Sequence, residues 1–130
     1  MKFSELAEYF KKLEETSSRL AITEILADLF LKASPSEIGK ICYLLSGRVV
    51  PLYEAIEFGV ADKFVMRAIG RAYDKRPEEV LRAFKKSGDL GIMAQSLHQG
   101  KGSGITVSLV FEKLYDMATN SGTGSQEKKI

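Results

Sequence analysis

Apolar side chains recur every three or four residues along most of this chain, and this spacing constrains the fold more than any other feature. Phe3, Leu6, Phe10 and Leu13 form the first such set, with glutamates and lysines between them. Residues spaced in this way lie on one face of an α-helix. The pattern therefore predicts an amphipathic helix over residues 3–15.

Similar patterns, bounded by hydroxyl residues, proline and glycine, predict further helices. Their expected ranges are about 18–32, 35–46, 60–73, 77–86 and 107–119, and residues 92–97 are expected to form another short segment. Residues 105–110 would also suit a strand, but Val107, Val110, Phe111 and Leu114 keep helical spacing, and Thr106 is a suitable cap. We therefore expect an all-α fold, a compact multi-helix bundle forming a single helical domain over residues 1–130.

Residues 98–104 contain three glycines and are expected to form a flexible loop. Glycines of this kind can also approach a phosphate, but the nucleotide-binding pattern GxxxxGK[ST] is not met here. A flexible connector is thus favoured over a nucleotide site.

Composition indicates an ordinary intracellular protein. With 130 residues, of which 45% are hydrophobic, the chain can close a core without metals or disulfides. The one cysteine, Cys42, lies in an apolar run and is expected in the core. The start, MKFSELAEYF, lacks the apolar segment of a signal peptide, and no apolar run approaches the roughly 20 residues that cross a bilayer. We expect a cytoplasmic chain with no membrane contact.

Positive charge is concentrated in the middle of the chain. Residues 63–100 hold eight Lys or Arg against four Asp or Glu, whereas residues 1–62 hold seven against ten. Within this part Lys63, Arg67 and Arg71 follow one another at i, i+4 and i+8, which places them on one stripe of a helix. A solvated helix face and a binding site for a polyanion are both compatible with that stripe.

Residues typical of enzymes are scarce. The chain has one histidine, His98, and one cysteine, and the patterns HExxH, CxxC and GxSxG are absent. We expect no catalytic residues, no metal site and no cofactor in this chain, and an exposed His98.

Two helix starts combine small hydroxyl or glycine residues with cations. The first is Thr16-Ser17-Ser18-Arg19, and the second is Gly122-Thr123-Gly124-Ser125, followed by Lys128 and Lys129. Such starts offer free backbone N–H groups, hydroxyls and a cation to an anion. They are also compatible with ordinary helix caps.

A weak internal sequence similarity, here called the echo, relates these two starts. At an offset of 107, Phe3, Phe10 and Ser18 correspond to Val110, Met117 and Ser125. If the echo reflects a duplication, residues 120–130 begin the capped helix of a second repeat, and the chain is a truncated piece of a larger domain.

Four strings, in order, give the chain a family resemblance. They are FSELAEYFKKLEETSSRLAITEILADLF, ICYLLSGRVVPLYEAIEFGVADK, KSGDLGIMAQ and ITVSLVFEKLYDMATNSGTGSQEKKI. Together they resemble the N-terminal DNA-binding domain of ATP-dependent DNA ligases of the archaeal and eukaryotic type. The resemblance implies a two-halved helical domain that grips nicked double-stranded DNA through phosphates in the minor groove, without sequence preference, and serves replication and repair.

The resemblance also implies roles for particular residues. One strand would meet Thr16, Ser18 and Arg19, and the matching contact on the other would begin with Gly122, Gly124, Ser125, Lys128 and Lys129. ATP and Mg²⁺ are implied for the full-length ligase. The adenylation motif KxDG is absent from this chain, so catalysis would reside in the adenylation and OB-fold domains of the parent.

Two further points bear on partners. Some archaeal relatives bind the sliding clamp through a glutamine and two aromatic residues, but the loop over residues 99–104 has no aromatic residue. Clamp binding through that loop is therefore not expected. An alternative function for the chain is a helical protein–protein interaction scaffold, which would bind partners through exposed apolar helix faces.

Overall fold

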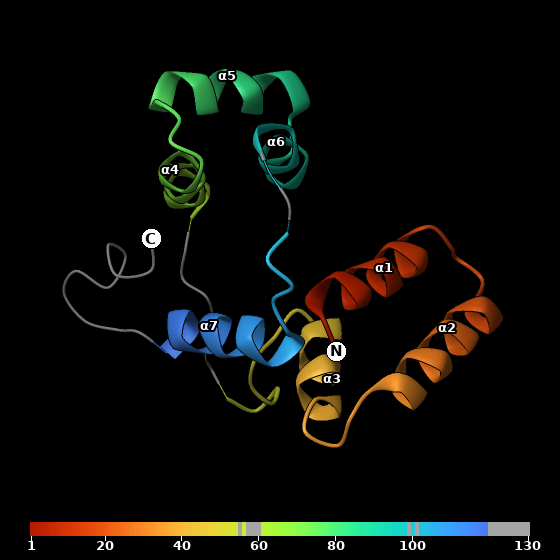
Figure 1. The fold of residues 1–130 in the computed structure, drawn as a ribbon. Coiled ribbons are helices and arrows are strands. Elements are labelled where there is room, and N and C mark those ends of the chain that lie inside the picture. Colours follow the sequence, from red (N-terminus) through yellow and green to blue (C-terminus); the bar gives the residue numbers. More distant parts are fainter. Residues whose placement is uncertain (55, 57–60, 99, 101, 120–130) are drawn as a thin grey trace. The chain divides into compact units, whose positions relative to one another are not determined.

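The structure is a computed structural model that describes residues 1–54, 56, 61–98, 100 and 102–119 (Figure 1). Its described residues form seven helices and no extended strand, which confirms the all-α fold. The helices are α1 (Phe3–Glu14), α2 (Arg19–Lys32), α3 (Ile38–Leu45), α4 (Asp62–Ala72), α5 (Pro77–Ser87), α6 (Leu90–Leu97) and α7 (Val107–Thr119). No described helix is long and apolar enough to cross a membrane.

The chain divides into two compact units. Unit 1 contains α1, α2, α3 and α7, and unit 2 contains α4, α5 and α6, so the chain leaves unit 1 and later returns to it. The expected single domain over residues 1–130 stays a prediction. The loop expected over residues 98–104 also stays a prediction, because residues 99 and 101 lie outside the described part.

The core of unit 1 joins residues from four helices. Leu6, Leu29, Ile41 and Val107 are fully buried and come from α1, α2, α3 and α7 respectively, and Tyr9 of α1 completes the cluster. Leu6 and Val107 belong to the apolar sets that helical spacing predicts for α1 and α7. Burial of these side chains is what holds the four helices together.

A short backbone pairing fixes the start of the chain against the start of α7. The N–H of Phe3 donates to the carbonyl of Ile105 at 2.8 Å, and the N–H of Val107 donates to the carbonyl of Met1 at 3.0 Å. These two hydrogen bonds make an isolated antiparallel β-bridge between Lys2 and Thr106. Residues 105–106 are thus briefly extended, and the helix predicted from 107 begins at once, with Thr106 Oγ1 accepting from the N–H of Leu109 at 3.2 Å.

The predicted helix over 35–46 begins later than expected. Residues Pro35 to Glu37 form a turn, and α3 begins at Ile38. The last residue of this turn, Glu37, is 7% exposed. Its carboxylate accepts from the N–H of Ser34 at 3.2 Å and also binds the α-amino group of Met1. Glu37 is thereby held at the entry of the helix.

Cys42 is exposed, which corrects its expected place in the core. The adjacent residue, Ile41, is the one fully buried in α3. Neighbouring residues on a helix point about 100° apart, so burial of Ile41 against α1 and α7 turns Cys42 away. An apolar run without clear periodicity did not show which of its members faces inward.

Arg48 organises the irregular stretch that follows α3. Its guanidinium donates to the carbonyls of Val50 and Pro51, both at 3.3 Å, and of Glu54 at 2.9 Å. Val49 and Val50 are buried, at 4% and 3% exposed. A stretch that the sequence marks only as irregular is therefore anchored by two valines and one arginine.

Unit 2 is built around Val80 of α5 and Met93 of α6, which are 1% and 0% exposed. The helix predicted from Pro77 is confirmed, with proline in its first turn and Gly88 ending it at φ +70°. That conformation suits glycine, which has no Cβ to clash. The short segment expected over residues 92–97 is the helix α6, which begins at Leu90 because the Asp89 side chain accepts from the N–H of Ile92 at 2.8 Å and caps it.

Candidate functional site

The start of α2 is a capped helix end on an exposed surface. Ser18 is in an extended conformation, and its hydroxyl accepts from the N–H of Ala21 at 3.3 Å. Thr16 Oγ1 accepts in turn from the N–H of Ser18 at 3.2 Å. The predicted cap is confirmed, and the loop and first turn are held by consecutive hydroxyls.

Several groups at this end are available to an anion. The N–H of Ile22 already donates to the carbonyl of Ser18. Within the described part of the chain, the N–H groups of Arg19 and Leu20 have no acceptor. The first turn of a helix carries a partial positive charge, and the exposed side chain of Arg19 adds a full one. Ser18 and Thr16 can still donate through their hydroxyl protons.

The far half of α2 is fastened to α1 by charged and aromatic contacts. Tyr9 Oη donates to Asp28 Oδ2 at 2.7 Å, and Lys32 Nζ lies 3.5 Å from the same oxygen. The hydrogen bond from Tyr9, followed by the charge of Lys32, lowers the pKa of Asp28. Lys12 and Lys32 both lie over the ring of Tyr9, at 5.1 and 5.4 Å from its centroid. These contacts fix the direction in which the start of α2 points within unit 1.

The second predicted start lies outside the described residues. It comprises Gly122, Gly124, Ser125, Lys128 and Lys129. Its pairing with the start of α2 stays a prediction.

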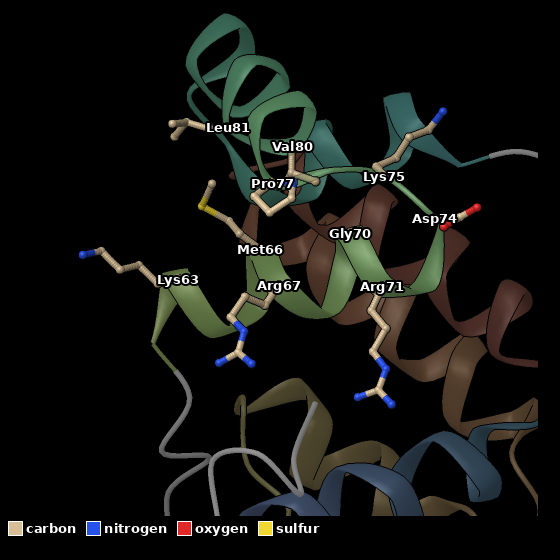
Figure 2. Close-up of a pocket in the computed structure, with 10 residues that line it drawn as sticks. All are labelled: Lys63, Met66, Arg67, Gly70, Arg71, Asp74, Lys75, Pro77, Val80 and Leu81. Atoms are coloured by element: carbon tan, nitrogen blue, oxygen red, sulfur yellow. The ribbon is translucent and has the colours of Figure 1, made fainter.

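The predicted cationic stripe lies on α4 of unit 2. Lys63, Arg67 and Arg71 are all exposed. The guanidinium carbon of Arg67 lies 5.6 Å from the centroid of the Phe64 ring. Figure 2 shows Arg67 and Arg71 one turn apart and extending to the same side of α4.

This stripe borders a groove of about 580 Å³ that the sequence did not indicate. A fourth cation, Lys75, joins from the turn between α4 and α5. The apolar part of the groove is formed by Met66, Gly70, Pro77, Val80 and Leu81, which come from both helices. Lys75 continues the four-residue spacing of the stripe, but it lies beyond the end of α4, so helical periodicity alone could not place it there.

The turn between the two helices explains how Lys75 reaches the groove. Asp74 has a positive φ of 52°, which ends the helical path of the chain. The N–H of Lys75 then donates to the carbonyl of Gly70 at 2.8 Å. Gly70 is buried, and a Cβ added there would lie 3.0 Å from the carbonyl oxygen of Lys75. Glycine at position 70 therefore allows this close approach.

His98 is exposed, as predicted, and its ring meets the edge of Tyr73 at 5.5 Å between centroids. Among the described residues, no cluster of three His, Cys, Asp or Glu side chains could hold a metal ion.

The comparison with known families decides the identity of the chain. The family described as DNA ligase N terminus matches residues 2–130. The chain belongs to this family. The resemblance seen in its four strings is thereby confirmed.

Individual relatives of this ligase N-terminal chain agree. A probable DNA ligase of Dictyoglomus thermophilum is 47% identical over 130 residues, which are all of this chain and 22% of the relative. A DNA ligase 2 of Thermofilum pendens is 38% identical over 98% of the chain and 24% of the relative. A DNA ligase 1 of Methanosarcina mazei is 36% identical over 99% and 22%. The chain thus spans between a fifth and a quarter of these ligases.

Proposed function

We propose that this chain contributes to holding nicked double-stranded DNA for an ATP-dependent DNA ligase, by binding backbone phosphates without sequence preference. The start of α2 carries this proposal. It presents two N–H groups that have no acceptor among the described residues, two hydroxyls and Arg19 on one exposed helix end. Groups of this kind position a protein on DNA but do not read bases.

The comparisons support the wider setting of this proposal. The relatives are named as DNA ligases, and the chain covers only their N-terminal part. The chain has no KxDG lysine to accept AMP, so the nucleotide, Mg²⁺ and sealing chemistry belong to the adenylation and OB-fold domains of a parent ligase. Replication and repair are the processes in which such a ligase would act.

Fluorescence anisotropy of a labelled nicked duplex tests the proposal. Each phosphate contact contributes about −0.9 to the slope of log affinity against log salt, so three or four contacts give roughly −3 to −4. Arg19→Ala should reduce the slope by about 1 and weaken binding of nicked duplexes of different sequence equally. The combined variant Arg19→Ala, Lys128→Ala, Lys129→Ala should lose measurable binding.

Lys113→Ala is the matched control. Lys113 is an exposed cation on α7, in the same unit as Arg19, and no DNA contact is proposed for it. Its removal changes the net charge by the same amount as Arg19→Ala. Equal loss of affinity in the two variants would show that binding depends on the net charge of the chain and not on Arg19 in particular. A DNA affinity that does not change with salt would refute phosphate binding.

A further inference from the structure

The groove beside α4 combines two chemistries on opposite edges. Figure 2 shows Arg67 and Arg71 extending from α4 on the side away from α5, whereas Met66 extends toward α5, the helix that carries Val80 and Leu81. Leu81 is 44% exposed. One edge of the groove is therefore cationic, and the other offers apolar surface to solvent.

Charge at the groove strongly favours an anionic partner. Four of the described lining residues are cationic, and Asp74 is their one carboxylate. Arginine is well suited to this task because its planar guanidinium binds a carboxylate through two hydrogen bonds. Arginine and methionine are also enriched at protein interfaces, where methionine adapts its shape to the partner.

The apolar edge decides which anion fits best. A DNA backbone presents charged, hydrated phosphates, and these would leave Met66, Pro77 and Leu81 without an apolar partner. Bases of single strands stack on aromatic rings, but none of the described lining residues is aromatic. An amphipathic helix with acidic and apolar faces matches both edges at once, in the way that helices bind grooves in other proteins.

We propose that this groove is a docking site for an acidic amphipathic helix of a partner protein. Glutamates or aspartates of the partner pair with Lys63 and Arg71, and its leucine-type side chains cover Met66, Pro77 and Leu81. This interaction is separate from the proposed phosphate contact, which lies on α2 in unit 1.

The test uses the full chain and two synthetic peptides of about 15 residues, long enough to form a helix. The first has leucines at helical spacing on one face and glutamates on the other. The second has the same glutamates, with serine in place of each leucine. Titration calorimetry should detect binding of the leucine peptide and affinity lower by about tenfold or more for the serine peptide.

Variants of the chain locate the site. Arg71→Gln and Leu81→Ser should each weaken binding of the leucine peptide by about tenfold, the factor that follows from losing one good contact. Asp74→Asn should tighten it, because asparagine tolerates the positive φ while removing the one carboxylate. Lys85→Gln with Lys86→Gln, which removes two cations of α5 outside the groove, should leave it unchanged.

Other outcomes would overturn the proposal. Equal binding of the two peptides would show attraction by charge alone. An equal loss in the Lys85 and Lys86 variant would place the interaction elsewhere, as would an undiminished affinity in Arg71→Gln and Leu81→Ser. If neither peptide binds and Arg71→Gln instead weakens binding of a nicked duplex, the groove is a DNA surface. Circular dichroism melting of each variant separates these results from loss of fold.

Discussion

Tyr9 and Asp28 join the first two helices through a hydrogen bond of 2.7 Å between a phenol and a carboxylate. Tyr9 is 6% exposed and belongs to the core of unit 1. Asp28, in contrast, lies on the accessible side of α2 and also meets Lys32. This pair connects the core of unit 1 with the surface of the helix whose start is proposed to bind phosphate.

Tyr9→Phe should lower the melting temperature at neutral pH, because it removes the hydrogen bond and retains the buried ring. The effect should depend on pH in a defined direction. The hydrogen bond lowers the pKa of Asp28 in the folded chain. Stability from this source is present above the ordinary aspartate pKa of about 3.9 and is lost as the pH falls through the lower folded pKa.

Thermal melts of both proteins between pH 7 and pH 2.5 check this expectation. The gap between their melting temperatures should close toward the acid end. Tyr43→Phe is the control, since it keeps the ring that stacks on Phe111 at 6.3 Å. A gap that stays constant with pH would mean that ring packing, not ionised Asp28, accounts for the difference.

Glu37 gives a second prediction about pH. Its carboxylate is buried and binds the Met1 amino group, and this hydrogen bond lowers its pKa. Glu37→Gln should therefore reduce the free energy of unfolding by about 1–3 kcal/mol at pH 7. The reduction should diminish below about pH 4.3, where glutamate in the unfolded chain becomes protonated. Urea unfolding at several pH values measures it, and acetylation of the amino group should produce a similar loss.

Local features of the sequence predicted most helices correctly. The start of α2 at Ser18, the cap at Thr106, the first turn at Pro77 and the end at Gly88 all follow from residues within a few positions of one another. Capping and helical periodicity act over one or two turns, so a linear sequence contains the information needed.

Features that depend on distant residues were missed. The contact of Glu37 with the amino group of Met1 joins residues that are 36 positions apart. The groove depends on the turn after α4, in which the positive φ of Asp74 brings Lys75 back beside Gly70. It also depends on the packing of Val80 against Gly70. Periodicity identifies the face of a single helix but not the partner that will cover it. For this reason it predicted the stripe of α4 without the groove.

Gly70 and Gly39 offer a matched test of the packing beneath the groove. Alanine exceeds glycine in helix propensity by about 1 kcal/mol, so Gly39→Ala in α3, where a Cβ meets nothing within 4 Å, should stabilise the chain by up to that amount. Gly70→Ala should lose this gain or reverse it. Its Cβ would lie 3.0 Å from the Lys75 carbonyl oxygen and 3.2 Å from Val80 Cγ2. Chemical denaturation measures both, and equal stabilisation would show that the turn after α4 can move aside.

Ser18 is the residue at which helix capping and phosphate binding can be separated. Aspartate caps helices as well as serine does, and its charge suits the positive end of the helix, so Ser18→Asp should leave the melting temperature unchanged or raise it. The same carboxylate would repel a phosphate held by the N–H groups of Arg19 and Leu20. Binding of nicked duplex at low salt should therefore fall by about tenfold or more.

Thr106→Asp is the control, because Thr106 caps α7 in the same manner and no phosphate contact is proposed there. It should keep both stability and DNA affinity. If Ser18→Asp binds DNA as tightly as the unmodified chain, the start of α2 is an ordinary cap, and the phosphate contact must be sought elsewhere.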